Sequence, residues 1–310
     1  MKILLVDDEY ELLKLLAEII SNEGHDVVTA VNGKIALELF SNTKPGFDAV
    51  LTDIKMPEMD GLSLLKQIRN MDPEIPVVIM TGHGDLDLSI QALRLSAFDY
   101  MLKPLNLASL QQVLEKIAAV CQRYQELPAL LPFMESSNTL TLPCQTRWIS
   151  VAVSHFQQIY APLCRMANDG FQEITTSLYE LLSNAFIHGS LEVDSRLKEE
   201  SWDKFENMVR LREADPVFGT RKVHAHCHVA PEGISTEDPT HVIVGVTFDV
   251  EDEGKGFDTT KRLKTRDPMD LLTASGRGIM MIQMFMDEVS WNEKGNRMHL
   301  KKRLRIPRGE

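Results

Sequence analysis

Five residues at the ends of predicted strands could together carry out phosphoryl chemistry: Asp7, Asp8, Asp53, Thr81 and Lys103. The carboxyl ends of parallel strands meet at one edge of a sheet, which is where ligands bind. Three carboxylates gathered there would repel one another, so the cluster needs a cation, and oxygen-only ligands favour Mg²⁺. The metal and Lys103 would then stabilise the charge that develops as a phosphoryl group is transferred to Asp53.

A second set of polar residues lies in the otherwise apolar run ELLSNAFIHG, from Glu180 to Gly189. Glu180 and Asn184 are four residues apart, so a helix places both on one face. Burying two unpaired polar groups is costly, which indicates that they have a ligand. The amide oxygen of Asn184 can reach a Mg²⁺ ion.

Two glycine-containing segments further along the chain could complete a nucleotide site. DVEDEGKGFD places Asp252 at a strand end before Gly254 and Gly256, and SGRGIMMI places Gly276 and Gly278 at the start of a helix. A carboxylate at a strand end can accept a hydrogen bond from an adenine amino group, and glycines let the backbone approach a ligand closely. A helix N-terminus offers N–H groups and a positive dipole to phosphates. Neither a Gly-x-x-x-x-Gly-Lys-Ser/Thr loop nor a protein-kinase signature occurs, so those ATP-binding folds are not supported.

The first 122 residues alternate strands and helices in a way that would position the first set of residues. Five apolar runs are each followed by an amphipathic helix: KILLV, DVVTA, DAVLTD, PVVIMTG and AFDYMLK. This pattern predicts a doubly wound, flavodoxin-like (βα)5 domain of the α/β class, with a parallel sheet covered on both faces.

The remainder of the chain has a different pattern. The stretch ELPALLPFMESSNTLTLP contains three prolines and a Ser-Ser-Asn cluster, which predict a linker over 123–137 followed by a second domain over 138–310. Helices grouped with antiparallel strands predict an α+β sandwich for this domain. A polar stretch at about 191–221 is predicted to be an irregular insertion, which is either an interaction surface or a packed excursion.

The motifs of the first domain resemble the receiver domain of two-component response regulators. The resemblance rests on LLVDDE, LTDIKMPEMDG, MTGHGD and YMLKP and covers residues 1–122. It implies a sensor histidine kinase as the phosphodonor and a cis Lys103–Pro104 bond. It also implies a set of roles: Asp53 as the phosphoacceptor, Asp7, Asp8 and Asp53 as Mg²⁺ ligands, Thr81 and Tyr100 as a switch pair, and Lys103 as the contact to the phosphoryl group. An aromatic residue such as Tyr100 in an edge strand is, on its own, equally explained by packing.

The three motifs of the second domain, in their order, resemble the N, G1 and G2 boxes of GHKL (Bergerat-type) ATPases. The resemblance covers roughly 138–305 and implies an α/β sandwich that binds Mg²⁺ and ATP. It implies these roles: Asn184 binds the metal, Asp252 binds adenine, and Gly254, Gly256, Gly276 and Gly278 form the nucleotide pocket and its lid, residues 257–275.

The closing segment GRGIMMIQMFMDEVSWNEKGNRM carries a closer resemblance within that fold, to the anti-sigma-factor serine/threonine kinases of the RsbW type, which lack an acceptor hairpin. His155 is the sole upstream candidate for an acceptor histidine, and it lies 25 residues before Glu180, too few for a separate helical hairpin. In the anti-sigma family the N-box glutamate is the general base toward a serine or threonine hydroxyl, a role that falls here on Glu180.

Together the resemblances imply a response regulator whose Asp53 phosphorylation controls an ATP-dependent serine/threonine kinase. The expected partners are a sensor histidine kinase, an anti-sigma-factor antagonist as substrate and a sigma factor, with homodimerisation possible. Two alternatives stay open. The second domain could bind ATP and sequester a partner without phosphotransfer, or the chain could be a hybrid histidine kinase that uses His155.

The composition argues against two classes of protein, those that bind nucleic acid directly and those that span a membrane. The net charge of −12 over 310 residues argues against direct nucleic-acid binding, and no apolar run is long enough to span a bilayer. The chain is therefore expected in the cytoplasm. Four cysteines without paired spacing suit buried thiols better than disulfides: Cys121, Cys144, Cys164 and Cys227.

Three histidines in VHAHCHV alternate along one predicted strand and so share a face: His224, His226 and His228. They could bind zinc or copper. The polar outer face of a sheet is the simpler explanation, because no further ligand is evident.

Overall fold

The computed structural model describes residues 1–43, 46–82, 91–92, 95–257 and 277–308. The chain divides into two compact units, Met1–Leu127 and Pro128–Arg308, and each is described by itself.

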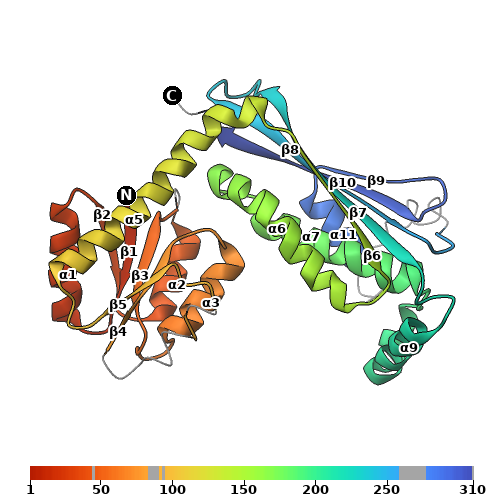
Figure 1. Cartoon of the computed structure of the whole chain (residues 1–310), viewed down its shortest axis with the longest axis horizontal. Helices are drawn as coiled ribbons and strands as arrows, with labels where there is room; N and C mark the ends of the chain where they lie inside the picture. The colour runs from red at the N-terminus through yellow and green to blue at the C-terminus, as the bar shows by residue number, and fades with distance from the viewer. Residues whose placement is uncertain (44–45, 83–90, 93–94, 258–276, 309–310) are drawn as a thin grey trace. The chain divides into compact units, whose positions relative to one another are not determined.

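The first unit is built on a five-stranded parallel sheet in the order β2-β1-β3-β4-β5 (Figure 1). The strands are β1 (Lys2–Val6), β2 (Asp26–Ala30), β3 (Ala49–Asp53), β4 (Val77–Thr81) and β5 (Asp99–Leu102). The helices are α1 (Tyr10–Asn22), α2 (Gly33–Asn42), α3 (Gly61–Met71) and α5 (Leu107–Glu126). The predicted (βα)5 fold is confirmed for these elements, while most of the fourth predicted helix, 86–96, falls outside the described residues.

Both faces of this sheet are covered by helices, because the side chains of its central strands are mostly apolar on both sides. Side chains of α1 and α5 pack on one face and those of α2 and α3 on the other, which gives two separate hydrophobic clusters. β3 and β4 are buried along their whole length, as expected for central strands of a parallel sheet. Their carboxyl ends therefore carry the polar residues to one edge.

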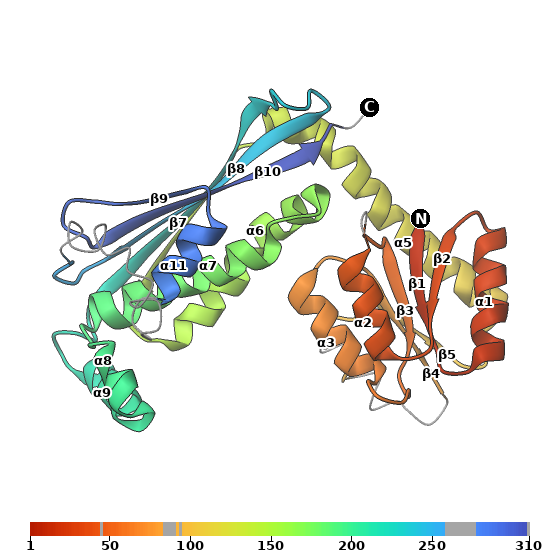
Figure 2. The ribbon, with the colours of Figure 1, turned by 180° about the vertical axis from the view of Figure 1, so that it is seen from behind.

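The second unit contains an antiparallel sheet in the order β6-β7-β8-β10-β9. Its strands are β6 (Ser136–Pro143), β7 (Lys222–Ile234), β8 (His241–Asp252), β9 (Glu288–Trp291) and β10 (Arg297–Pro307). Its helical elements are η1 (Leu127–Phe133), α6 (Arg147–Ala167), α7 (Phe171–Ser183), η2 (Asn184–Ser190), α8 (Arg196–Glu200), α9 (Trp202–Ala214) and α11 (Arg277–Phe285). The predicted α+β sandwich is confirmed: α6, α7 and α11 lie on the same face of the sheet (Figure 2).

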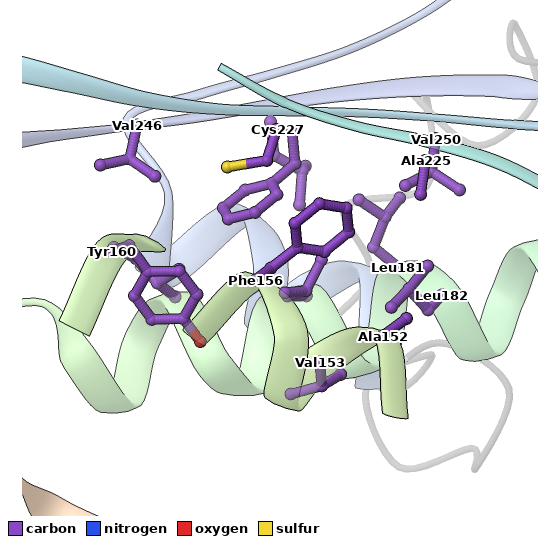
Figure 3. Close-up of a cluster of buried hydrophobic side chains, with 14 of the residues drawn as sticks. Ala152, Val153, Phe156, Tyr160, Leu181, Leu182, Ala225, Cys227, Val246 and Val250 are labelled. Atoms are coloured by element: carbon purple, nitrogen blue, oxygen red, sulfur yellow. The ribbon is translucent and has the colours of Figure 1, made fainter. Parts of the chain in front are cut away.

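The core of this unit lies between α6, α7 and the inward face of the sheet. Phe156 and Tyr160 of α6 are fully buried, and their rings make edge-on contacts with Phe248 of β8, each at 5.9 Å between centroids. Figure 3 shows Phe156 pointing from the helix toward the sheet, in the direction of Cys227. The four cysteines are all buried and free, which confirms the prediction of buried thiols.

Two parts of the chain differ from the sequence prediction. The stretch 191–221 is not irregular, because it forms α8 and α9, and Phe205 and Val209, four residues apart on α9, are both buried. The predicted linker 123–137 contains the end of α5, the 3-10 turns of η1 and the start of β6. Its prolines are accommodated because η1 does not need the backbone hydrogen bonds of a continuous α-helix.

No helix in the described part of the chain is both long enough and apolar enough to cross a membrane.

Candidate phosphoacceptor and nucleotide sites

The edge of the parallel sheet gathers the predicted phosphoryl-transfer residues around one ammonium group. Lys103 Nζ lies 2.8 Å from Asp53 Oδ1 and 2.8 Å from Asp7 Oδ2. Asp7 is fully buried and Asp53 is nearly so. The backbone holds both carboxylates as well, since Asp7 Oδ1 accepts a hydrogen bond from Glu9 N and Asp53 Oδ2 accepts one from Lys55 N. The Lys103–Pro104 bond is cis, as predicted.

Burial and the two ion pairs act against each other on these groups. Burial raises the pKa of Asp53, and the hydrogen bond from Lys103 only partly offsets this effect. For Lys103, burial alone would lower the pKa, but the hydrogen bonds to Asp53 and Asp7 outweigh it and raise the pKa overall. Lys103 is thus held as a cation between two carboxylates.

The side chains of this cluster fit a Mg²⁺ ion in part. Asp7 and Asp53 supply the oxygens that Mg²⁺ prefers. The third predicted ligand, Asp8, is exposed, and no group of three His, Cys, Asp or Glu side chains is arranged as a metal site among the described residues. The ammonium group of Lys103 supplies the positive charge between Asp7 and Asp53 in this structure.

Thr81 and Tyr100 lie on the neighbouring strands β4 and β5. Thr81 is 1% exposed, and its hydroxyl has no hydrogen-bond partner among the described residues. Its backbone oxygen accepts a hydrogen bond from Lys103 N at 2.7 Å, which holds the end of β4 against the residue that follows β5. A buried, unpaired hydroxyl suits an additional phosphoryl oxygen. Tyr100 is 39% exposed and pairs with Ile79 across the strands.

The second unit brings the predicted N-box residues against the start of α11. Glu180 belongs to α7, and Asn184 begins the π-helical turn η2 directly after it. A Cβ atom on Gly278 of α11 would lie 2.3 Å from Glu180 Oε2, so the absence of a side chain at 278 admits the carboxylate. Asn184 Nδ2 is buried and has no partner among the described residues. An unpaired amide beside a carboxylate fits a site that receives a polar ligand.

Asp252 ends β8, as predicted, and is buried beside the glycine loop. Its Oδ1 accepts a hydrogen bond from Gly254 N at 2.8 Å. Its backbone is held by Asn296, whose Nδ2 donates to the Asp252 carbonyl oxygen at 2.6 Å. Gly189 packs on the Asp252 carboxylate so closely that a Cβ atom would lie 2.4 Å from Oδ2.

Of the other predicted glycines, Gly254 and Gly256 lie within the described residues. Gly256 has φ +74°, a conformation that favours glycine, and Gly254 packs against the carbonyl oxygen of Gly189. Gly276 and almost all of the predicted lid, 257–275, lie outside the described residues.

A polar cavity of about 410 Å³ lies elsewhere in the second unit, between the start of α6 and α9. Its walls are formed by Gln145, Thr146, Arg147, Arg210, Glu213 and Ala214. None of these residues is among the predicted nucleotide-binding residues.

Three residues that are not among the predicted site residues take part in the contacts around Asp252 and the neighbouring loop: Asn296, Glu192 and Arg221. Asn296 holds the backbone of Asp252, whereas Glu192 and Arg221 form an ion pair at 3.0 Å. Asn296 lies in the segment GN, which could have drawn attention to it, but no spacing in the sequence relates Glu192 to Arg221.

Burial also has a consequence for the predicted adenine contact. Desolvation raises the pKa of Asp252 to about 6, although the Gly254 hydrogen bond and the charges of Lys294 and Arg221 oppose it. Between the ordinary pKa and about 6, the folded protein binds a proton that the unfolded chain does not. The stability contributed by Asp252 is therefore present at low pH and is lost as the pH rises through about 6.

Adenine binding should show the opposite trend, because an ionised carboxylate is the better acceptor for the adenine amino group. We expect ADP affinity to be constant above pH of about 6 and to fall below it. Calorimetric titration with ADP across this range measures the trend, and Asp252→Asn should remove the bend. An identical bend in Asp252→Asn would show that another group is responsible.

Comparison with known proteins assigns both units to a class. The model of the response regulator receiver domain matches residues 3–115, and that of the histidine kinase-like ATPase domain matches residues 148–302. The protein is thus a receiver domain joined to an ATPase-type domain. Because the second match covers half of its length, the chain belongs to the histidine kinase-like ATPase domain family.

The similar curated proteins match over a limited length. Regulatory protein AtoC of Escherichia coli (strain K12) is 35% identical over 136 residues, which is 44% of this chain and 29% of AtoC. Transcriptional regulatory protein ZraR of the same strain is 40% identical over 117 residues, 38% of this chain and 26% of ZraR. The chain therefore spans less than a third of the length of these relatives. A solved receiver domain protein from Clostridium thermocellum is 35% identical over 41% of this chain and 98% of its own, with a TM-score of 0.38.

Proposed function

We propose that this protein is a two-component response regulator whose phosphorylation on Asp53 controls an ATP-dependent serine/threonine protein kinase in its second domain. The substrate is a serine or threonine of an anti-sigma-factor antagonist, and a sigma factor is the other partner in the circuit. A sensor histidine kinase supplies the phosphoryl group that arrives on Asp53. The receiver match and the ATPase match support the two halves of this proposal separately.

The observation that carries the kinase proposal is the placement of Glu180. Its carboxylate lies against Gly278 at the start of α11, four residues before Asn184 and its unpaired amide. A helix start favours phosphates, so a base at this position would face the group to be transferred. Asn184 would hold Mg²⁺ through its amide oxygen, and Asp252 would accept the adenine amino group.

The chemistry assigned to the chain's own residues is proton transfer and orientation. Mg-ATP supplies the phosphoryl group when it is bound. Glu180 would take the proton of the incoming serine or threonine hydroxyl, whose oxygen gains the γ-phosphoryl group as its bond to the bridging oxygen breaks and ADP leaves. In the receiver, Lys103 and Thr81 would bind phosphoryl oxygens on Asp53, and Asp7, Asp8 and Asp53 would hold the metal.

The helix that contains His155 supports a hydroxyl acceptor over a histidine acceptor. His155 is exposed on α6, but the same helix buries Phe156 and Tyr160 against the sheet. α6 is therefore an integral part of the ATPase core, whereas an acceptor hairpin would have to be a separate pair of helices. This packing favours the kinases that have no hairpin.

Incubation of the full-length protein with Mg-ATP and a panel of anti-sigma-factor antagonist domains tests the proposal. We expect acid-stable phosphoserine or phosphothreonine on one antagonist. ATP binding without any transfer would contradict the kinase proposal and support a sequestering module. Acid-labile phosphate on the protein itself that disappears in His155→Ala would support a hybrid histidine kinase instead.

A further inference from the structure

The insertion that contains α8 and α9 is closed at its base by one ion pair. Arg221, at the end of the insertion, donates from Nη1 to Glu192 Oε1 at 3.0 Å, near its start. The same nitrogen donates to the Ser190 carbonyl oxygen at 2.7 Å. The side chains of Arg221 and Glu192 are only 20% and 17% exposed. Pairs buried to this degree are screened less than surface pairs, so this contact constrains both ends of the insertion.

The second carboxylate oxygen of Glu192 reaches the glycine loop. Lys255 Nζ lies 3.4 Å from Glu192 Oε2, and Lys255 stands between Gly254 and Gly256. Burial would raise the pKa of Glu192, but the bonds from Arg221 and Lys255 outweigh it and lower the pKa. One ionised carboxylate thus joins the base of the insertion to the loop beside Asp252.

Backbone contacts also connect Arg221 to the surroundings of Asp252. Arg221 holds the carbonyl oxygen of Ser190, and the preceding Gly189 packs on both the Asp252 carboxylate and Gly254. A displacement of Ser190 would therefore move the residue that forms one wall of the Asp252 environment. The approach is close enough that a Cβ atom at 189 would overlap the Asp252 carboxylate.

The other side of Arg221 contacts the residues that follow α9. Its guanidinium lies 4.7 Å from the centroid of the Phe218 ring, and Arg212 of α9 lies 3.8 Å from the same ring. A second link runs through η2, where His188 Nδ1 is 2.6 Å from the Val193 carbonyl oxygen and the His188 ring lies 6.4 Å from that of Phe205. The position of α9 and the geometry around Asp252 are thus connected through packed groups.

We propose that Arg221 is a positioning residue of the nucleotide site, which couples α9 to the Asp252–Gly254 segment through Glu192 and Ser190. The insertion then sets the affinity for adenine nucleotide, and any partner that shifts α9 changes that affinity. The inference rests on the proposed nucleotide-binding role of Asp252.

Titration of ADP into the full-length protein tests the proposal. We expect about three- to thirtyfold weaker binding for Arg221→Ala and for Glu192→Gln, the range in which distant contacts modulate a site. The double variant should lose less affinity than the product of the two single losses, because both substitutions disrupt the shared Arg221–Glu192 contact. Arg221→Lys should recover part of the affinity, since it keeps the charge but not the fork of donors.

A second readout separates positioning from a general loss of structure. The charge of Arg221 lowers the pKa of Asp252, so in Arg221→Ala the bend in ADP affinity should move to higher pH. The matched control is Arg305→Ala on β10, which breaks an exposed 2.8 Å pair with Glu237 and should leave both readouts unchanged. If Arg221→Ala does not fold, the ADP affinities of Arg221→Lys and Glu192→Gln test the proposal instead.

The outcomes distinguish this inference from the proposed function. Wild-type protein that does not bind ADP would overturn both. Wild-type protein that binds ADP, with Arg221→Ala binding equally well, would overturn the inference alone. Weaker binding with no movement of the pH bend would also overturn it, because a purely structural loss predicts that combination.

Discussion

Lys103→Met is expected to lower the free energy of unfolding of the receiver unit by about 3–5 kcal/mol at neutral pH. The substitution leaves Asp7 and Asp53 buried without the ammonium that lies 2.8 Å from each. Removing one member of a buried charge cluster costs the desolvation of the charges left behind. Urea unfolding followed by circular dichroism measures the loss.

The matched control is Lys116→Met, which removes a 2.6 Å pair with Asp99 whose lysine is 60% exposed. This surface pair should contribute no more than about 1 kcal/mol. The pH dependence provides a second check. Without Lys103 the folded-state pKa of Asp53 rises further, so the folded protein takes up a proton and the deficit shrinks as the pH falls. Equal losses for the two variants would contradict the assigned role of Lys103 in the cluster.

Glu180→Gln is expected to lower the rate of phosphotransfer to the antagonist by about 10²–10⁴-fold, which is the typical contribution of a general base. The amide keeps the size of the side chain but cannot accept the hydroxyl proton. ADP affinity should stay close to that of the wild type, because Asn184 and Asp252 are unchanged. Single-turnover phosphotransfer and ADP titration measure the two effects separately.

Two further variants test whether the position and the charge of the Glu180 carboxylate matter for phosphotransfer. Gly278→Ala places a methyl group 2.3 Å from the present position of Glu180 Oε2, so the flexible carboxylate must move away while the fold is retained. Phosphotransfer should fall without a comparable loss of stability. Glu180→Asp keeps a carboxylate and should retain more activity than Glu180→Gln. Full activity in Glu180→Gln would remove Glu180 from the mechanism.

The sequence could predict the acidic cluster because the topology of a parallel sheet does most of the positioning. Asp53 and Thr81 each end a short apolar strand and Lys103 directly follows β5, so one sheet edge collects them. The position of the Lys103 side chain between Asp7 and Asp53 could not be predicted from the sequence. It depends on side-chain packing, and the predicted metal would compete for the same carboxylates.

The insertion could not be predicted in the same way. On α9, Phe205 and Val209 are buried in a helix that is otherwise largely polar, which is too weak a pattern to distinguish it from a loop. The Arg221–Glu192 pair joins residues 29 apart, and neither residue belongs to a recognisable motif. The π-helical turn η2 likewise leaves no distinct sequence pattern, although it carries Asn184 at its start.

The central claim is that phosphate on Asp53 controls phosphotransfer by the second domain to a hydroxyl on another protein. The most direct measurement is the initial rate of phosphoserine formation on the antagonist, with the full-length protein either untreated or treated with acetyl phosphate. We predict that the two rates differ by at least about fivefold, the lower end of typical coupling between sites, and that Asp53→Ala abolishes the difference. Equal rates in the wild type, or the same change in Asp53→Ala, would contradict the account.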